Sequence, residues 1–251
     1  MSGDLVTLQL LVVSAAAAER ELWRAGANFT SVPVKVTEAG DAASACALLA
    51  KGGADLTILD FSLGGAEAVI AAAQAAPRKC LVVMAAHPSV IADASMVAGA
   101  EGAVPKPANI DAASDLVERC IKLKLAIRVL IVDDSGTMRS IVRKILSNSR
   151  YKIDVAEAEE GIGAIKRIRD GSFDLVFLDY NMPGLNGIET LSEIKRENPR
   201  LAVVMITSTI DAALAERARA AGALAFLKKP FYPADIDAVL KRFYGLRVPV
   251  G

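Results

Sequence analysis

The segment "DLVFLDYNMPGLNG", from Asp174 to Gly187, decides the fold. It begins as a short apolar, β-branched strand and reaches an acid, Asp179, before a turn rich in Gly, Pro and Asn. The first half of the chain contains a similar stretch, "DLTILDFSLGG", from Asp55 to Gly65. Strands that are apolar on both faces are typical of a parallel sheet covered by helices. The repeat therefore predicts two α/β units in one chain.

Both halves alternate short apolar runs with longer Ala-rich or amphipathic stretches, which is the pattern of βα units. The expected strands are 8–13, 32–37, 55–59, 81–85 and 102–104 in the first half, and 128–132, 152–157, 173–178, 202–206 and 223–227 in the second. The expected helices include 66–76, 92–100 and 110–124. This pattern predicts one domain over residues 1–124 and another over 125–251, with "YGLRVPVG" at the end as a tail.

Composition argues against several classes of protein. Apolar residues make up 53% of the 251 and charged residues 23%, so each half can build a core. No apolar run approaches the roughly 20 residues that cross a bilayer, and the first residues lack the basic start of a secretion signal. We therefore expect a cytoplasmic protein without membrane insertion. Zero net charge without a Lys and Arg stripe argues against direct nucleic-acid binding, and three cysteines without a CxxC pair argue against a zinc site.

Acidic residues end two predicted strands of the second half. Asp133 and Asp134 follow "RVLIV", and Asp179 follows "LVFL". The carboxyl ends of parallel strands line one crevice, so these side chains should meet. Adjacent carboxylates repel one another and attract a cation, and oxygen-only ligands suit Mg²⁺. Thr207 and Lys229, at the ends of the next two strands, would add a hydroxyl and an ammonium able to orient a phosphoryl group during attack by a carboxylate.

The motifs "VLIVDDSGTMRSIVRKIL", "DLVFLDYNMPGLNGIE", "VVMITS" and "AFLKKPF" occur in this order over residues 126–245. Together they resemble the receiver domain of two-component response regulators, and "DDSGTMR" is similar to the stand-alone chemotaxis receivers. The resemblance implies two flavodoxin-like, doubly wound (βα)5 receiver domains in tandem, each with a five-stranded parallel sheet. It also implies that Asp179 is the phosphoacceptor, served by a histidine kinase or a histidine phosphotransferase.

The same resemblance implies a set of Mg²⁺ ligands in the second half. Asp134 and Asp179 would bind the ion directly, Asn181 would bind it through its backbone carbonyl, and Asp133 would bind it through a water.

It further implies a role for three residues beyond the metal. Lys229 would contact the phosphoryl group, Thr207 would hydrogen-bond to it, and Phe226 would be the aromatic switch residue. Each residue has a plainer interpretation, since strand-end acids cap helices, lysines are commonly solvated, and aromatic residues at strand ends commonly belong to the core.

The first half lacks most of this set. It keeps the phosphoacceptor acid as Asp60 and the lysine as Lys106, and we expect these two to form a partly buried ion pair. The acid pair and the two switch positions are replaced by Ser14, Ala15, Ala86 and Ala103. The first half is therefore expected to be a degenerate pseudo-receiver that docks a partner or restrains the second half.

The leading hypothesis is a response regulator without an attached output domain, which acts by protein binding and not as an enzyme. A dimer that forms on phosphorylation is expected from the same resemblance. One alternative is a phosphorylation-independent scaffold, and another is a fragment of a longer tandem-receiver regulator such as a diguanylate cyclase. A phosphatase with an aspartyl nucleophile is disfavoured, because its Asp-x-Asp motif would follow the first strand, whereas Asp179 follows the third.

Overall fold

The computed structural model describes residues 7–208 and 212–247, and these residues form two sheets of five strands each. The strand order is β2-β1-β3-β4-β5 in the first sheet and β7-β6-β8-β9-β10 in the second, so the two orders are equivalent. All neighbouring strands within the two sheets are parallel. The predicted fold class, two flavodoxin-like doubly wound units in tandem, is therefore confirmed.

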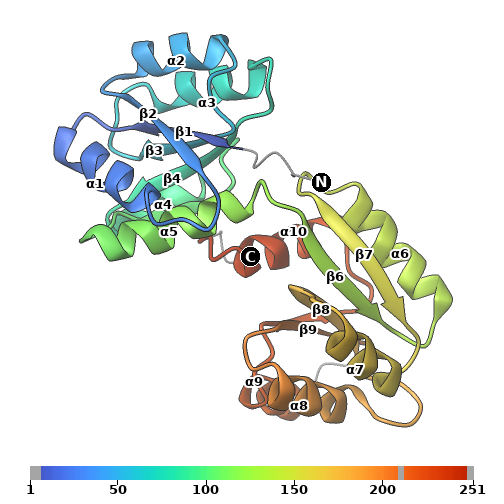
Figure 1. The fold of residues 1–251 in the computed structure, drawn as a ribbon. Coiled ribbons are helices and arrows are strands. Elements are labelled where there is room, and N and C mark those ends of the chain that lie inside the picture. The colour runs from blue at the N-terminus through green and yellow to red at the C-terminus, as the bar shows by residue number, and fades with distance from the viewer. Residues whose placement is uncertain (1–6, 209–211, 248–251) are drawn as a thin grey trace, which may run out of the picture. The chain divides into compact units, whose positions relative to one another are not determined.

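The first sheet and its helices occupy the first half of the chain (Figure 1). The strands are β1 (Leu8–Val13), β2 (Val34–Ala39), β3 (Leu56–Asp60), β4 (Leu81–Ala86) and β5 (Ala103–Pro105). The helices are α1 (Ala17–Ala27), α2 (Ala42–Ala50), α3 (Ala66–Ala75), the short 3₁₀ turn η1 (Pro88–Val90), α4 (Ile91–Ser95) and α5 (Ile110–Lys122).

The second sheet repeats this order (Figure 1). The strands are β6 (Ile127–Val132), β7 (Ile153–Ala158), β8 (Leu175–Asp179), β9 (Ala202–Thr207) and β10 (Ala225–Lys228). The helices are α6 (Gly136–Ser147), α7 (Gly161–Asp170), α8 (Gly187–Glu197), α9 (Ala212–Ala220) and α10 (Pro233–Phe243). Within the described residues, no helix combines the length and the apolar character needed to span a bilayer.

Each sheet is covered by helices on both faces, which explains why its central strands are apolar throughout. Every residue of β3 and of β8 is buried. Helix α1 packs beside α5 and α2 beside α3, while α6 packs beside α10 and α7 beside α8. The observed strand boundaries lie within two residues of the predicted ones, because the apolar pattern of a doubly covered strand is hard to mistake.

One predicted helix is wrong in length. Instead of running over 92–100, α4 ends at Ser95. The amide of Met96 turns back to the carbonyl of Asp93, and Gly99 adopts a φ of +86°, which is left-handed backbone that a helix cannot contain. The residues after the helix, 96–100, form turns that lead into β5.

The chain separates into two compact units, and the division is not a simple cut in the sequence. The first unit contains the described residues up to Lys124 together with Tyr244–Arg247, and the second contains Leu125–Phe243. The main chains of Ala103 and Arg247 exchange two hydrogen bonds, of 3.1 and 2.9 Å, as an antiparallel bridge on β5. A Cβ at Gly102 would lie 2.6 Å from the Arg247 carbonyl oxygen, so only glycine allows this approach. The described part of the expected tail, Tyr244–Arg247, thus belongs to the first unit as a turn followed by a single bridge residue, and 248–251 lie outside the described residues.

Candidate functional site

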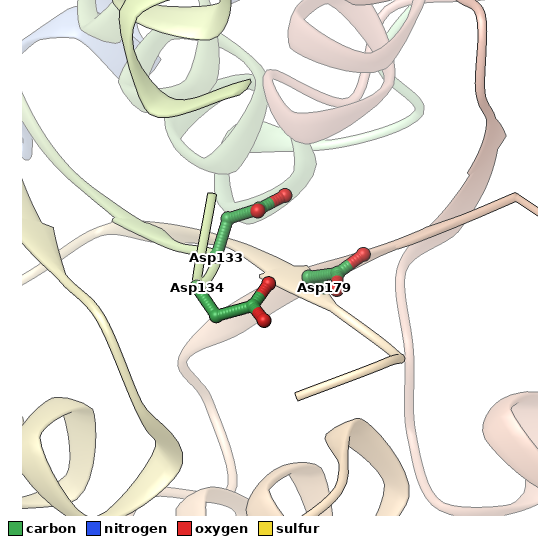
Figure 2. Close-up of side chains that lie close together, drawn as sticks. All are labelled: Asp133, Asp134 and Asp179. Carbon is green, nitrogen blue, oxygen red and sulfur yellow. The ribbon is translucent and has the colours of Figure 1, made fainter. Parts of the chain in front are cut away.

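Three carboxylates converge at the carboxyl ends of two paired strands in the second unit. Asp133 and Asp134 follow β6, and Asp179 is the last residue of β8. One oxygen from each carboxylate lies within 4.8 Å of the others, and Figure 2 shows the three side chains gathered at this edge. Asp133 and Asp179 are buried while Asp134 is exposed. The topology therefore brings together the three acids that the sequence predicted.

Lys229 directly follows the last residue of β10, and its side chain reaches this cluster. Its Nζ is 2.8 Å from Asp133 Oδ2 and 2.8 Å from Asp179 Oδ1, so one ammonium bridges two buried carboxylates. The Lys229 amide donates to the Thr207 carbonyl at 2.7 Å, which fixes its backbone beside β9. Burial opposes the charged ammonium, but the hydrogen bonds to Asp133 and Asp179 outweigh it and raise the pKa of Lys229.

The electrostatic balance of the site remains negative. Burial raises the pKa of Asp179, and the charges of Asp133 and Asp134 raise it further, while the hydrogen bond and charge of Lys229 act in the opposite direction. One lysine therefore does not compensate three carboxylates. An oxygen-only donor set with excess negative charge fits a small hard cation.

The loop after β8 packs the start of α8 against Asp179. The amide of Asn181 donates to Asp179 Oδ2 at 3.1 Å. Asn186 and Glu189 form a capping box that begins α8. A Cβ at Gly187 would lie 2.5 Å from the Asp179 carbonyl oxygen, so this glycine is required by close approach. The first unit has a shorter loop and no capping box at the start of α3, although the Ser62 amide donates to Asp60 Oδ1 in the same way.

Thr207 and Phe226, the two residues with a predicted switch role, lie on the neighbouring strands β9 and β10. Thr207 is fully buried at the end of β9. Phe226, on β10, is partly buried and packs against the core cluster of the second unit. Their predicted switch roles stay predictions.

The site is accessible from one side. A groove of about 790 Å³ opens beside Asp134, and its lining includes Arg139, Glu157 and Pro183. Arg139 is held in place by Glu157, at 3.0 Å, and donates to the main-chain carbonyl of Asp133 at 2.8 Å. The exposed carboxylate of Asp134 thus faces open space while the other two acids are enclosed.

The equivalent position of the first unit has a different arrangement. The expected ion pair is present, with Lys106 Nζ 2.9 Å from Asp60 Oδ1. Sequence reasoning missed a further acid, Glu19 in the first turn of α1, whose Oε1 is also 2.9 Å from Lys106 Nζ. Comparing the repeats position by position would have revealed it, because Glu19 stands where the second half has Met138.

Comparisons with known proteins find relatives of the second unit. Residues 129–241 match the family model described as a response regulator receiver domain. "Chemotaxis protein CheY-3" of Vibrio cholerae is 35% identical over 119 residues, which is 47% of this chain and 91% of that protein. "Chemotaxis protein CheY" of Bacillus subtilis is 37% identical over 117 residues, 47% of this chain and 94% of that protein.

A solved structure extends the similarity of fold to both units. A protein described as a "probable two-component system response regulator/GGDEF domain protein" aligns over 95% of this chain and 98% of its own, with 24% identity and a TM-score of 0.52. The motifs at the strand ends, the converging acids and the matched relatives agree, and the chain belongs to the response regulator receiver family of two-component signalling.

Proposed function

We propose that this protein is the response regulator of a two-component phosphorelay, and that Asp179 accepts a phosphoryl group from the phosphohistidine of a histidine kinase or histidine phosphotransferase. The observation that carries this proposal is the convergence of Asp133, Asp134 and Asp179 within 4.8 Å, with Lys229 bridging two of them at 2.8 Å. Three carboxylates held together at the carboxyl ends of the strands lower the stability of the fold, and such clusters are typical of binding or catalytic sites.

Mg²⁺ is the proposed cofactor, because the donor set offers oxygens alone and leaves a negative excess. Asp134 and Asp179 would hold the ion directly, the Asn181 carbonyl would add a third ligand, and Asp133 would bind through water. When bound, the ion supplies positive charge that neutralises the oxygens of the incoming phosphoryl group.

The phosphoryl transfer itself would be carried by residues of this chain. A carboxylate oxygen of Asp179 attacks phosphorus, a P–O bond forms, the P–N bond to the donor histidine breaks, and the imidazole nitrogen keeps the electron pair. The ammonium of Lys229 stabilises the negative phosphoryl oxygens, and the Thr207 hydroxyl donates a hydrogen bond to one of them. The Asn181 amide already holds the second oxygen of Asp179, which orients the carboxylate.

The output would be protein binding and not turnover of a separate substrate. Movement of Thr207 and Phe226 on phosphorylation would reshape the surface made by α9, β10 and α10, and a phosphorylation-dependent dimer is one form this output could take. The first unit would serve as a docking or regulatory domain, and the second unit, Leu125–Phe243, as the phosphoacceptor domain. The downstream target would be a protein.

The proposal is tested by incubating wild type, Asp179→Asn and Asp60→Asn with Mg²⁺ and acetyl phosphate and weighing the intact proteins by mass spectrometry. Asp60→Asn is the matched control, because Asp60 ends β3 as Asp179 ends β8. One added phosphoryl group that vanishes only in Asp179→Asn is expected. Absence of label in folded wild type would favour the scaffold function, and loss of label in Asp60→Asn alone would mean that the first unit is the acceptor.

A further inference from the structure

The two units share a contact at equivalent positions, so the residues around it can be compared one by one. Arg20 donates to the main-chain carbonyl of Ser14 at 2.6 Å, just as Arg139 does to that of Asp133 at 2.8 Å. Helices α1 and α6 are therefore held on their strands by the same contact. Because these helices start in the same pose, a residue one position before the arginine should point to the same place in both units.

That position holds Met138 in the second unit and Glu19 in the first. Glu19 Oε1 is 2.9 Å from Lys106 Nζ, and its Oε2 accepts a hydrogen bond of 2.8 Å from the Ser14 hydroxyl. The same lysine is 2.9 Å from Asp60 Oδ1, and the same hydroxyl lies 3.1 Å from Asp60 Oδ2. These four side chains form a ring in which Lys106 pairs with both carboxylates and the single Ser14 hydroxyl proton can serve either of them.

We propose that Lys106 and Ser14 form an anion site in the first unit, and that the carboxylate of Glu19 is its tethered occupant. The anion site lies directly in front of Asp60, where a phosphoryl group on that residue would have to stand. This inference rests on the proposed function in one respect, since it takes Asp60 as the counterpart of Asp179. With Glu19 in place, the first unit stays in one state and does not respond to a phosphodonor.

The hydrogen bonds to Asp60 agree with this assignment. Burial acts to raise the pKa of Asp60, but the hydrogen bonds from Lys106 and Ser62 outweigh it, so the pKa is lowered. Lys106 also holds Glu19 at the same distance as Asp60, so both carboxylates share one ammonium within the first unit. Glu19 supplies the anion that Lys106 and Ser14 would otherwise take from solution.

Chemical rescue tests the anion site in the full chain. Glu19→Ala removes the tethered carboxylate and leaves Lys106 and Ser14 in place, so acetate should enter. The readout is the NMR signal of the Ser62 amide, which donates to Asp60 Oδ1 at 3.0 Å, during a titration with sodium acetate against sodium chloride at equal ionic strength. We expect a saturating shift with acetate in Glu19→Ala and no such shift in wild type.

Two controls separate the anion site from general salt effects. Glu21→Ala removes an exposed acid from the same helix, one that pairs only at 3.4 Å with Arg24, and should show no acetate-dependent shift. Adding Lys106→Met to Glu19→Ala should abolish the response. If Glu19→Ala does not fold, Glu19→Ser takes its place, since serine also removes the tethered carboxylate and leaves its space open.

An acetate response that is equal in wild type and the Glu19 variants, or absent from all of them, overturns the proposal. The result is independent of the phosphoacceptor, because acetate is not a phosphodonor. Labelling of Asp179 by acetyl phosphate reports on the proposed function alone, so failure of either idea leaves the other intact.

Discussion

The segment Tyr244–Arg247 should stabilise the first unit, although it follows the second unit in the sequence. Leu246 is 5% exposed, and its Cβ lies 3.1 Å from the position that a Cβ at Gly102 would occupy. Leu246→Ala removes buried methyl groups from a residue that belongs to the first unit. The substitution should therefore destabilise the first sheet and leave α10, the helix that precedes the segment, unaffected.

The magnitude follows from burial. Truncation of a buried leucine to alanine costs about 2 to 5 kcal/mol, because transfer free energy is lost and a cavity remains. Since each ~1.4 kcal/mol is a factor of ten, the loss corresponds to at least roughly 30-fold faster exchange of amides that open with the first unit. Arg247→Pro should cost about 1 to 3 kcal/mol, because it removes the donor to the carbonyl of Ala103, which is fully buried.

Hydrogen exchange measured by mass spectrometry is the assay, with peptides from β4 and β5 compared with peptides from β8. Arg247→Ala is the matched control, since its side chain is exposed and both bonds of the bridge use the main chain. It should leave exchange nearly unchanged. Faster exchange confined to β8 in Leu246→Ala, or unchanged exchange in β4 and β5, would refute the assignment of this segment to the first unit.

Three further outcomes are expected. Gly187→Ala should lower the melting temperature of the second unit and abolish labelling by acetyl phosphate, because its Cβ would collide with the Asp179 carbonyl; wild-type labelling would contradict this. Lys229→Met leaves Asp133 and Asp179 without their ammonium, so thermal unfolding should show lower stability that Mg²⁺ partly restores, and melting curves insensitive to Mg²⁺ would count against the reasoning. The pKa of Asp60 in the folded state lies below its ordinary 3.8, so the stability it contributes is present above pH 3.8 and is lost as pH falls through the folded pKa. In denaturant unfolding, the loss of unfolding free energy caused by Asp60→Asn should therefore become smaller at low pH. A loss that is the same at every pH would exclude this linkage.

The sequence alone was enough to predict both sheets and the acidic cluster of the second unit. Apolar runs that alternate with helical stretches allow few topologies, and a parallel sheet places the carboxyl ends of its strands at one edge. Acids that end such strands, as Asp133 and Asp179 do, must then converge whatever the details of packing. Boundaries were less secure where an apolar run without a clear stop signal, as between Ser95 and Gly99, fits a helix and a turn equally well.

Tertiary structure alone decided the ring around Glu19 and the position of the chain's last described residues. Glu19 and Lys106 are 87 residues apart, and their contact depends on how α1 is seated beside β1 and on the reach of two long side chains. The bridge between Ala103 and Arg247 depends on an open sheet edge and on a glycine that lets two main chains approach. Hydrophobic periodicity determines the face and the strand end on which a residue lies. It carries no information about which distant side chain or backbone fills the space beside it, and that is settled only when the folded elements pack.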